Sequence, residues 1–373
     1  MKYPVQGILA IVAMFQLILF SVFLILRKSN RLPNRMLAVF LLGQFLIVSG
    51  ILTSKVFFDY FLANWPHVLL VGLPFFFLAA PSLYLYVISM STMNFSLRTR
   101  DLLHTIPFFT FVCYFGIIFY AHDADSKRLL LTSGAMRNNL ILSWLPVVFY
   151  IQILLYTVAG LRALRLYRGL IRNEFSSTEK INLNWLRLVL WGFIVAWLSD
   201  VATFSFQKLN WPIPFDYSYI SLGAFLAFFN IIFFKAWSQP EIFSRMEGKI
   251  KYQFSNLRQD EADRYLENLK THMETSKPYL NPELSLSDLA TSANIPPRHL
   301  SQIINERLHM NFFDYISQYR IEDAKRQLMN REDRKTVLEI LYAVGFNSKS
   351  SFNKAFKKFT DTTPTDFRKT ISR

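Results

Sequence analysis

Long apolar stretches separated by short polar connections occupy the first two thirds of the chain. Seven of these stretches reach the length of about 20 residues that an apolar helix needs to cross a lipid bilayer. Residues 1–238 are therefore predicted to form a seven-helix transmembrane bundle. We expect a kinked or partly interfacial third span because it contains Pro74 and Pro81. The predicted spans are residues 5–26, 36–53, 66–90, 102–121, 140–161, 185–206 and 217–237.

The pattern changes after residue 238, where charged residues become frequent and apolar positions recur at helical spacing. Residues 239–280 are predicted to be a linker that contains an amphipathic helix at about 257–273. Residues 281–373 are predicted to form a domain of short helices. The whole chain is thus expected to be all-α, with the seven-helix transmembrane bundle followed by a cytoplasmic all-α domain that holds two helix-turn-helix units.

The first helix-turn-helix motif is indicated by its capping residues. Ser285 with Asp288 three positions later is typical of a capping box at a helix start. Residues 293–296 are predicted to form a short turn, and Pro297 suits the first position of a second helix. Two short helices joined by a tight turn can place the second helix in the major groove of DNA.

A second motif of the same kind follows a longer helix. Asn311 is predicted to cap this linking helix, which would end near Leu328 and span about 27 Å. Thr336 then caps one short helix, Gly345 ends it, and Ser348 caps another. The linking helix would separate the two motifs by roughly the ~34 Å of one turn of DNA.

Charge separates the same two parts of the chain and orients the first. Only 18% of all residues are charged, and residues 241–373 hold 40 of the 67 charged side chains. In the transmembrane part, the loops after spans 1, 3 and 5, together with Arg187 at the start of span 6, carry 12 Lys and Arg residues, against 6 on the opposite side. Basic loops face the cytoplasm, so the N-terminus is predicted to lie outside and the C-terminal domain in the cytoplasm.

The C-terminal stretch GFNSKSSFNKAFKKFTDTTPTDFRK, with LSLSDLA upstream, resembles the DNA-binding domain of the AraC/XylS family of bacterial transcription regulators. The resemblance covers about the last 90 residues, whereas the apolar part suggests a membrane-tethered variant of that family. Asp361 and Asn294 stand where the family usually has glycine, and both residue types tolerate a left-handed backbone better than most. The resemblance implies a protein of the bacterial cytoplasmic (inner) membrane whose partner is double-stranded promoter DNA.

The resemblance also implies which side chains contact DNA. Phe352 and Phe356 are expected to face inward, which leaves the polar positions of the second recognition helix free. The family's base-reading positions correspond to Lys349, Ser350 and Lys354 there, and to Arg298, His299, Ser301 and Gln302 on the first recognition helix. Contacts to DNA phosphates are predicted for Ser348, Ser351, Asn353, Lys357 and Lys358. Lysine and arginine can both pair with guanine, arginine in bidentate fashion. The alternative is that these side chains form only solvated helix faces.

Ionisable side chains within the spans are candidates for sensing because they are costly to bury in lipid. Asp200 lies past the middle of the sixth span, and Trp197 is one turn before it. We expect a ligand pocket that opens outward and is anchored by Asp200, unless this carboxylate lies near the headgroups or pairs within the bundle. The arginines at 162, 165, 168 and 172 share one helical face, which would contact either anionic lipid or the DNA-binding domain.

The predicted function is that of a membrane-embedded one-component transcription regulator, whose DNA binding is controlled by a signal sensed in the membrane or outside. The expected partners are promoter DNA, the lipid bilayer and a small-molecule or envelope signal, and a homodimer is left open. No cofactor, metal site or catalytic residue is predicted, and the single cysteine, Cys113, excludes a disulfide within the chain and is expected to be buried. The alternatives are a transporter, channel or intramembrane enzyme with an accessory helix-turn-helix domain, or a receptor whose C-terminal domain binds protein.

Overall fold

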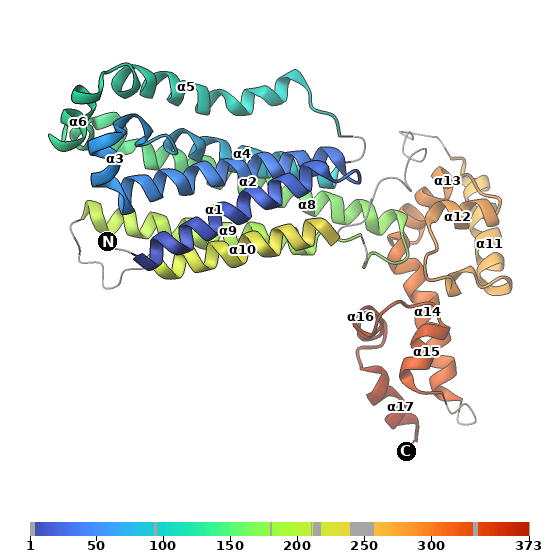
Figure 1. Ribbon diagram of the computed structural model, residues 1–373. Helices are drawn as coiled ribbons and strands as arrows, with labels where there is room; N and C mark the ends of the chain where they lie inside the picture. The colour runs from blue at the N-terminus through green and yellow to red at the C-terminus, as the bar shows by residue number, and fades with distance from the viewer. Residues whose placement is uncertain are drawn as a thin grey trace. The chain divides into compact units, whose positions relative to one another are not determined.

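The computed structural model describes residues 4–92, 95–179, 181–209, 211, 218–238, 257–330 and 335–372. Within these ranges the chain is helical, and its extended pairing is limited to one bridge between Phe175 and Ser285. The chain divides into two compact units (Figure 1). Unit 1 comprises Met1–Arg165 and Leu183–Glu241, and unit 2 comprises Leu166–Asn182 and Ile242–Arg373.

Unit 1 is a bundle of long apolar helices that run alongside one another (Figure 1). α1 packs against α2 and α10, and α2 packs in turn against α4. Shorter helices connect the long ones. The long helices are α1 (Pro4–Leu26), α2 (Arg31–Ile51), α4 (Phe76–Ser91), α5 (Ile106–Phe115), α8 (Leu140–Glu174), α9 (Asn184–Lys208) and α10 (Ser218–Ser238). The short ones are α3 (Phe58–Asn64), α6 (Ala124–Thr132) and α7 (Ala135–Asn138).

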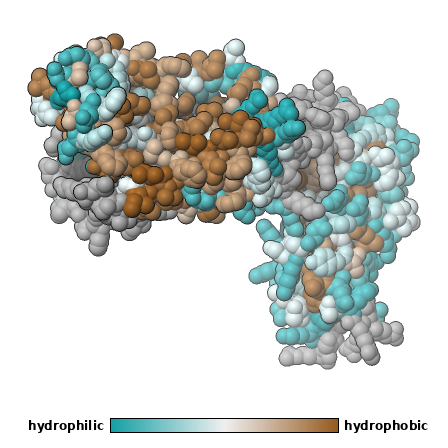
Figure 2. All heavy atoms as spheres, viewed as in Figure 1, coloured by the Kyte–Doolittle hydropathy of each residue, from teal (hydrophilic) through white to brown (hydrophobic). Residues whose placement is uncertain are grey.

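Apolar side chains cover much of the face of unit 1 that Figure 2 shows. Five stretches of the described residues are long and apolar enough to cross a membrane, and these coincide with the first five predicted spans. The two last predicted spans correspond to α9 and α10, whose apolar described parts are the shorter Asn184–Val195 and Phe225–Ser238. The count of seven spans therefore stays a prediction. The five stretches are Gly7–Leu26, Arg31–Val56, Pro66–Ser91, Thr99–Tyr120 and Leu140–Glu174.

The third predicted span is irregular before α4 but continuous within it. Pro74 lies in a short 3-10 helix, Leu73–Phe75, and Pro81 lies inside α4. The backbone of this segment packs directly against the backbone of α2. A Cβ atom added to Gly50 of α2 would lie only 2.8 Å from the Cα atom of Gly72. Cys113 is exposed on α5, so the expectation of a buried cysteine is wrong. Its side chain lies on the outward face of the helix, which the helical spacing of apolar residues alone did not distinguish from the inward face.

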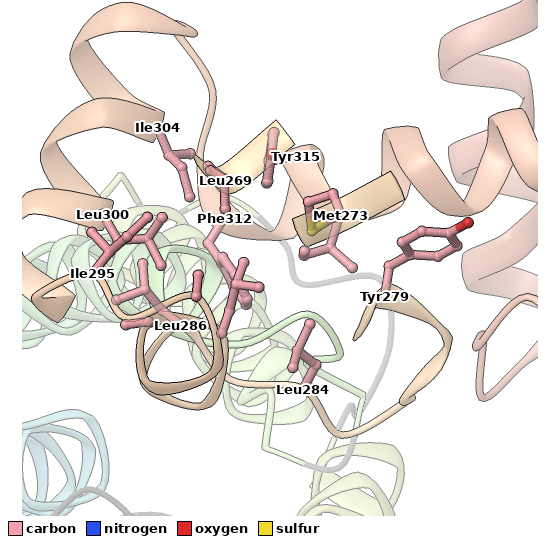
Figure 3. Packing of buried hydrophobic residues seen from close by; sticks show 14 residues of the cluster. Leu269, Met273, Tyr279, Leu284, Leu286, Ile295, Leu300, Ile304, Phe312 and Tyr315 are labelled. Carbon is pink, nitrogen blue, oxygen red and sulfur yellow. The ribbon is translucent and has the colours of Figure 1, made fainter. Parts of the chain in front are cut away.

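Unit 2 holds the short helices of the C-terminal domain and the last turns of α8. Its helices form two separate hydrophobic cores. The first core joins α11, α12, α13 and the start of α14, and Figure 3 shows Leu269, Leu300 and Phe312 converging within it. The helices are α11 (Gln259–Thr275), α12 (Leu286–Ser292), α13 (Pro297–Gln302), α14 (Phe312–Met329), α15 (Val337–Ala343), α16 (Lys349–Thr360) and α17 (Pro364–Ser372).

The second core joins the end of α14 to α15, α16 and α17. Phe352 and Phe356 are fully buried, which confirms the inward orientation predicted for them. The ring of Phe352 contacts those of Phe346 and Phe356, and Phe356 contacts Phe367 of α17. The two cores together place α13 and α16 as the second helices of two helix-turn-helix motifs, with α14 between them.

The predicted capping residues begin the helices of unit 2. The side chains of Ser285, Asn311, Thr336 and Ser348 each accept a hydrogen bond from the backbone amide three residues later. The two positions at which this chain lacks the glycine usual in the family also have the left-handed backbone conformation that was expected. Asn294 has a φ of 52° and Asp361 a φ of 58°, so both turns are kept with a non-glycine residue.

Gly345 is required where α15 turns into α16. Its φ is 93°, and an added Cβ would lie 2.7 Å from the carbonyl oxygens of both Tyr279 and Leu280. Gly345→Ala should therefore lower the free energy of unfolding of the second motif by about 2 kcal/mol, from left-handed strain and the collision with backbone. Amide hydrogen exchange of α15 and α16 in the full-length protein measures this loss.

Gly169→Ala is the matched control for this prediction, because Gly169 lies in the helix α8 with open space around its Cα. An alanine there should leave the exchange of α15 and α16 unchanged. Equal exchange in Gly345→Ala and Gly169→Ala would contradict the requirement for glycine at 345.

Candidate nucleic-acid interface

α16 has one buried face and one polar face. Ala355 lies in the second core beside Phe352 and Phe356. Asn353 and Ser351 are half-buried at the border of the polar face. The structure therefore brings the predicted base-reading residues of this helix and its lysines together on one accessible surface. The exposed residues are Lys349, Ser350, Lys354, Lys357 and Lys358.

α13 presents its predicted contact residues less openly. Arg298, His299, Ser301 and Gln302 are all half-buried. The ring of His299 lies 5.7 Å from that of Tyr265 in α11, measured between centroids. Local hydrogen bonds hold the other two polar side chains: Gln302 donates to the carboxylate of Glu306 over 2.9 Å, and Asn305 donates to the hydroxyl of Ser301 over 3.4 Å. Arg298 Nη2 and His299 Nδ1 are buried without a hydrogen-bond partner.

The amino end of α16 is occupied by a residue from the loop after α8. Ser348 Oγ accepts a hydrogen bond from the amide of Ser351 over 3.2 Å and donates one to the carboxylate of Glu179. The side chain of Asn347 donates to the hydroxyl of Ser177 over 3.2 Å. A helix amino end carries partial positive charge and attracts anions. Glu179 thus supplies an anion at this helix end, and sequence reasoning did not single it out.

Asp314 joins three elements of unit 2 through its carboxylate. Arg172 of α8 contacts Asp314 Oδ1 at 2.9 Å, and Lys358 of α16 contacts Oδ2 at 2.8 Å. Burial would raise the pKa of this carboxyl, but the hydrogen bond from Lys358 and the charge of Arg172 lower it. The Asp314 carboxylate is therefore charged at neutral pH. Of the predicted phosphate contacts, Lys358 is thus held by an ion pair.

Arg320 is the largest fully buried side chain of the described chain, with 1% of its surface exposed. Its guanidinium donates to the carbonyl oxygens of Tyr279 at 2.7 Å and Asn281 at 2.8 Å. It also donates to the carbonyl and the hydroxyl of Ser176, each at 3.2 Å. Burial lowers the pKa of Arg320 to about 10, so it stays protonated at neutral pH. Sequence reasoning missed this residue, although it lies at the edge of the apolar stripe of α14.

The candidate sensing residues belong to the sixth predicted span, which forms α9. The backbone of Trp197 and Asp200 belongs to α9, and their side chains lie outside the described residues. In α8, Gln152 is buried and donates to the carbonyl oxygen of Phe77 over 3.0 Å. Across the described part of the chain, no group of three or more His, Cys, Asp or Glu side chains could hold a metal ion.

Comparison with known proteins concerns the same C-terminal residues. Residues 289–370 match the model of a family described as a helix-turn-helix domain. An uncharacterised HTH-type transcriptional regulator of Staphylococcus aureus (strain COL) is 34% identical over 90 residues, which are 24% of this chain and 12% of that protein. The HTH-type transcriptional regulator GlxA of Rhizobium meliloti (strain 1021) is 33% identical over 86 residues, 23% of this chain and 26% of GlxA. No solved structure gives a significant match.

A third relative is the uncharacterised HTH-type transcriptional regulator YobQ of Bacillus subtilis (strain 168). It is 31% identical over 109 residues, which are 28% of this chain and 44% of YobQ. The chain thus spans less than half of the length of each of these relatives. Together with the two motifs described above, the family match identifies residues 289–370 as a helix-turn-helix domain of the AraC type.

Proposed function

We propose that this protein is a membrane-embedded transcription regulator that binds promoter DNA through its C-terminal domain. The observation that carries the proposal is the polar face of α16, which exposes lysines on the side opposite the buried Phe352 and Phe356. This helix stands second in a helix-turn-helix motif of a domain that matches the family. A second helix in that position enters the major groove in proteins of this kind.

The contacts to DNA divide by chemistry. Lys349, Ser350 and Lys354 lie on the exposed face where base edges can be reached, and they are proposed as base-reading residues. On α13, the same role is proposed for Arg298, with His299, Ser301 and Gln302 beside it. Contacts to phosphates are proposed for Ser348, Ser351, Asn353, Lys357 and Lys358. α14 has 18 residues, about 27 Å of helix, so the two motifs are spaced to meet one face of the duplex.

The apolar helices of unit 1 are proposed to anchor the regulator in the bacterial inner membrane and to sense a signal there. Their length and composition support insertion. The excess of Lys and Arg in alternate loops supports an N-terminus outside and a C-terminal domain in the cytoplasm, where DNA is accessible. Asp200 and Trp197 remain the proposed sensing residues, and homodimer formation is left open. A transporter or channel role would need several ionisable residues within the spans, and Asp200 is the one acidic residue that the seven predicted spans hold.

The proposed function is tested by DNA selection with the full-length protein in lipid nanodiscs. Genomic fragments retained by the protein should share one sequence pattern, and their binding should weaken steeply as salt rises because phosphate contacts release counterions. A C-terminal domain that binds protein instead of DNA would retain no common fragment, and its interaction would lack this salt dependence.

Lys354→Ala separates base reading from phosphate contact. If Lys354 reads a base, the variant should lose about 1–3 kcal/mol of binding to the selected site and tolerate substitution at one position of it. Lys357→Ala is the matched comparison, since it should weaken binding to every sequence alike and reduce the salt slope by about 1. A uniform loss in Lys354→Ala, with the same shallower slope, would assign Lys354 to a phosphate.

A further inference from the structure

The last residues of α8 and the loop that follows them lie against the DNA-binding domain within unit 2. We call residues 172–179 the strap. Its backbone pairs with the start of the first motif: the amide of Ser176 donates to the carbonyl oxygen of Leu284 over 3.1 Å, and Phe175 forms a bridge with Ser285. The hydroxyl of Ser176 donates to the same Leu284 carbonyl over 2.7 Å. The strap is therefore held to the domain by backbone as well as side-chain hydrogen bonds.

Buried and charged side chains of α14 hold the middle of the strap. Ser176 is buried, and its carbonyl and hydroxyl oxygens accept hydrogen bonds from the guanidinium of Arg320, as described above. Arg172 pairs with Asp314, and its guanidinium also stacks 5.2 Å from the ring centroid of Phe313. The strap thus accepts two of the hydrogen bonds that the buried guanidinium of Arg320 donates. Buried polar groups are almost always hydrogen-bonded in stable structures, so this contact is typical of a stable interface.

The end of the strap reaches the second recognition helix. Ser177 accepts from Asn347, and the carboxylate of Glu179 accepts from Ser348, the N-cap of α16. Backbone amides and a serine hydroxyl at a helix amino end form a binding site for a phosphate oxygen. A carboxylate presents the same kind of negatively charged oxygen. Glu179 consequently occupies the position at which Ser348 would meet a DNA phosphate.

Lys358 of α16 pairs with Asp314 of α14, and the same carboxylate pairs with Arg172 of the strap. The strap itself engages Ser348 through Glu179. Because Ser348 is assigned above to a phosphate, DNA and the docked strap compete for this residue.

We propose that the strap is an autoinhibitory element that masks the amino end of the second recognition helix and must leave it before DNA binds tightly. The proposal rests on the proposed function, because it assumes that α16 binds DNA. The strap joins α8 to α9 along the chain, and both contain apolar stretches predicted to cross the membrane. A signal that moves either helix would change how well the strap docks, and with it the affinity for DNA.

A reversible cross-link tests the proposal directly. The full-length protein carries one cysteine, so Cys113→Ser with S177C and N347C leaves a single reactive pair at the Ser177–Asn347 contact. A short bis-methanethiosulfonate reagent should join this pair and hold the strap in place. The cross-linked protein in nanodiscs should bind a mixed-sequence 40-bp duplex about tenfold more weakly than the same protein after reduction. Equal affinity before and after reduction would overturn the proposal.

A substitution that removes the charge of Glu179 gives a second test of DNA affinity that needs no added cysteines. Glu179→Gln should bind the same duplex about fivefold more tightly than wild type, because an amide competes poorly with phosphate at the helix end. Glu267→Gln is the matched control, since Glu267 is exposed on α11 and the change of charge is the same. Equal affinities of Glu179→Gln and Glu267→Gln would overturn the masking role alone. An absence of duplex binding by every variant, cross-linked or reduced, would instead overturn the proposed function and the strap proposal with it.

Discussion

Replacing Arg320 by alanine should lower the free energy of unfolding of unit 2 by about 4 kcal/mol, because two buried carbonyl groups, one half-buried carbonyl group and a hydroxyl lose their donor together. The affected groups belong to the neighbouring Tyr279 and Asn281 and to Ser176, which lies much earlier in the chain. Arg320→Lys should recover little of this loss. One ammonium group cannot reach carbonyls that the planar guanidinium contacts on several sides.

Hydrogen exchange in the full-length protein measures the Arg320 prediction. Amides of α14 and of the 3-10 turn Pro278–Leu280 should exchange faster in Arg320→Ala, and those of the strap should lose protection as well. Arg264→Ala serves as the control, since Arg264 is exposed on α11. Unchanged exchange at both the turn and the strap would show that Arg320 does not connect them.

Phe352→Ala should destabilise the second helix-turn-helix motif by about 3–5 kcal/mol, because it removes a fully buried ring from a small core. Phe346 and Phe356 lose their aromatic partner in this variant. The two cores of unit 2 are separate, so the damage should stay in α15, α16 and α17. DNA binding through α16 should be lost while α12 and α13 remain folded.

Exchange measured helix by helix distinguishes this local loss from a general one. Leu338→Ala is the matched truncation on α15, where Leu338 is 51% exposed, and it should change the free energy of unfolding by less than about 0.5 kcal/mol. Faster exchange of α12 and α13 in Phe352→Ala would contradict two separate cores. Retained operator binding would contradict the role of α16.

Much of unit 2 could be predicted from the sequence because its signals are local. A capping side chain accepts a hydrogen bond from the backbone amide three residues later, so the signal does not depend on the rest of the chain. Helix starts could therefore be predicted at Ser285, Asn311, Thr336 and Ser348. The spacing of Phe352 and Phe356 likewise assigns the buried face of α16. The apolar stretches of unit 1 are equally visible, since length and hydropathy depend on consecutive residues.

Contacts between distant segments left no such signal. Glu179 and Ser348 are separated by 169 residues, and Arg172 and Asp314 by 142. Gly50 and Gly72 were likewise not expected to meet, and the exposure of Cys113 depends on which face of α5 turns outward. Each of these facts follows from how helices pack, and no periodicity within one helix reports it.

The sequence by itself determined the all-α class, the apolar stretches, the two helix-turn-helix motifs and the polar face of the second recognition helix. Hydropathy, helical period and capping act over a few residues, so the chain states them directly. Only the tertiary structure decided that Arg320 is buried, that Asp314 joins Arg172 to Lys358, and that Glu179 lies on Ser348. These contacts join residues that are far apart in the sequence. They form only when the two hydrophobic cores of unit 2 have packed its helices together, which places the strap against α14 and α16.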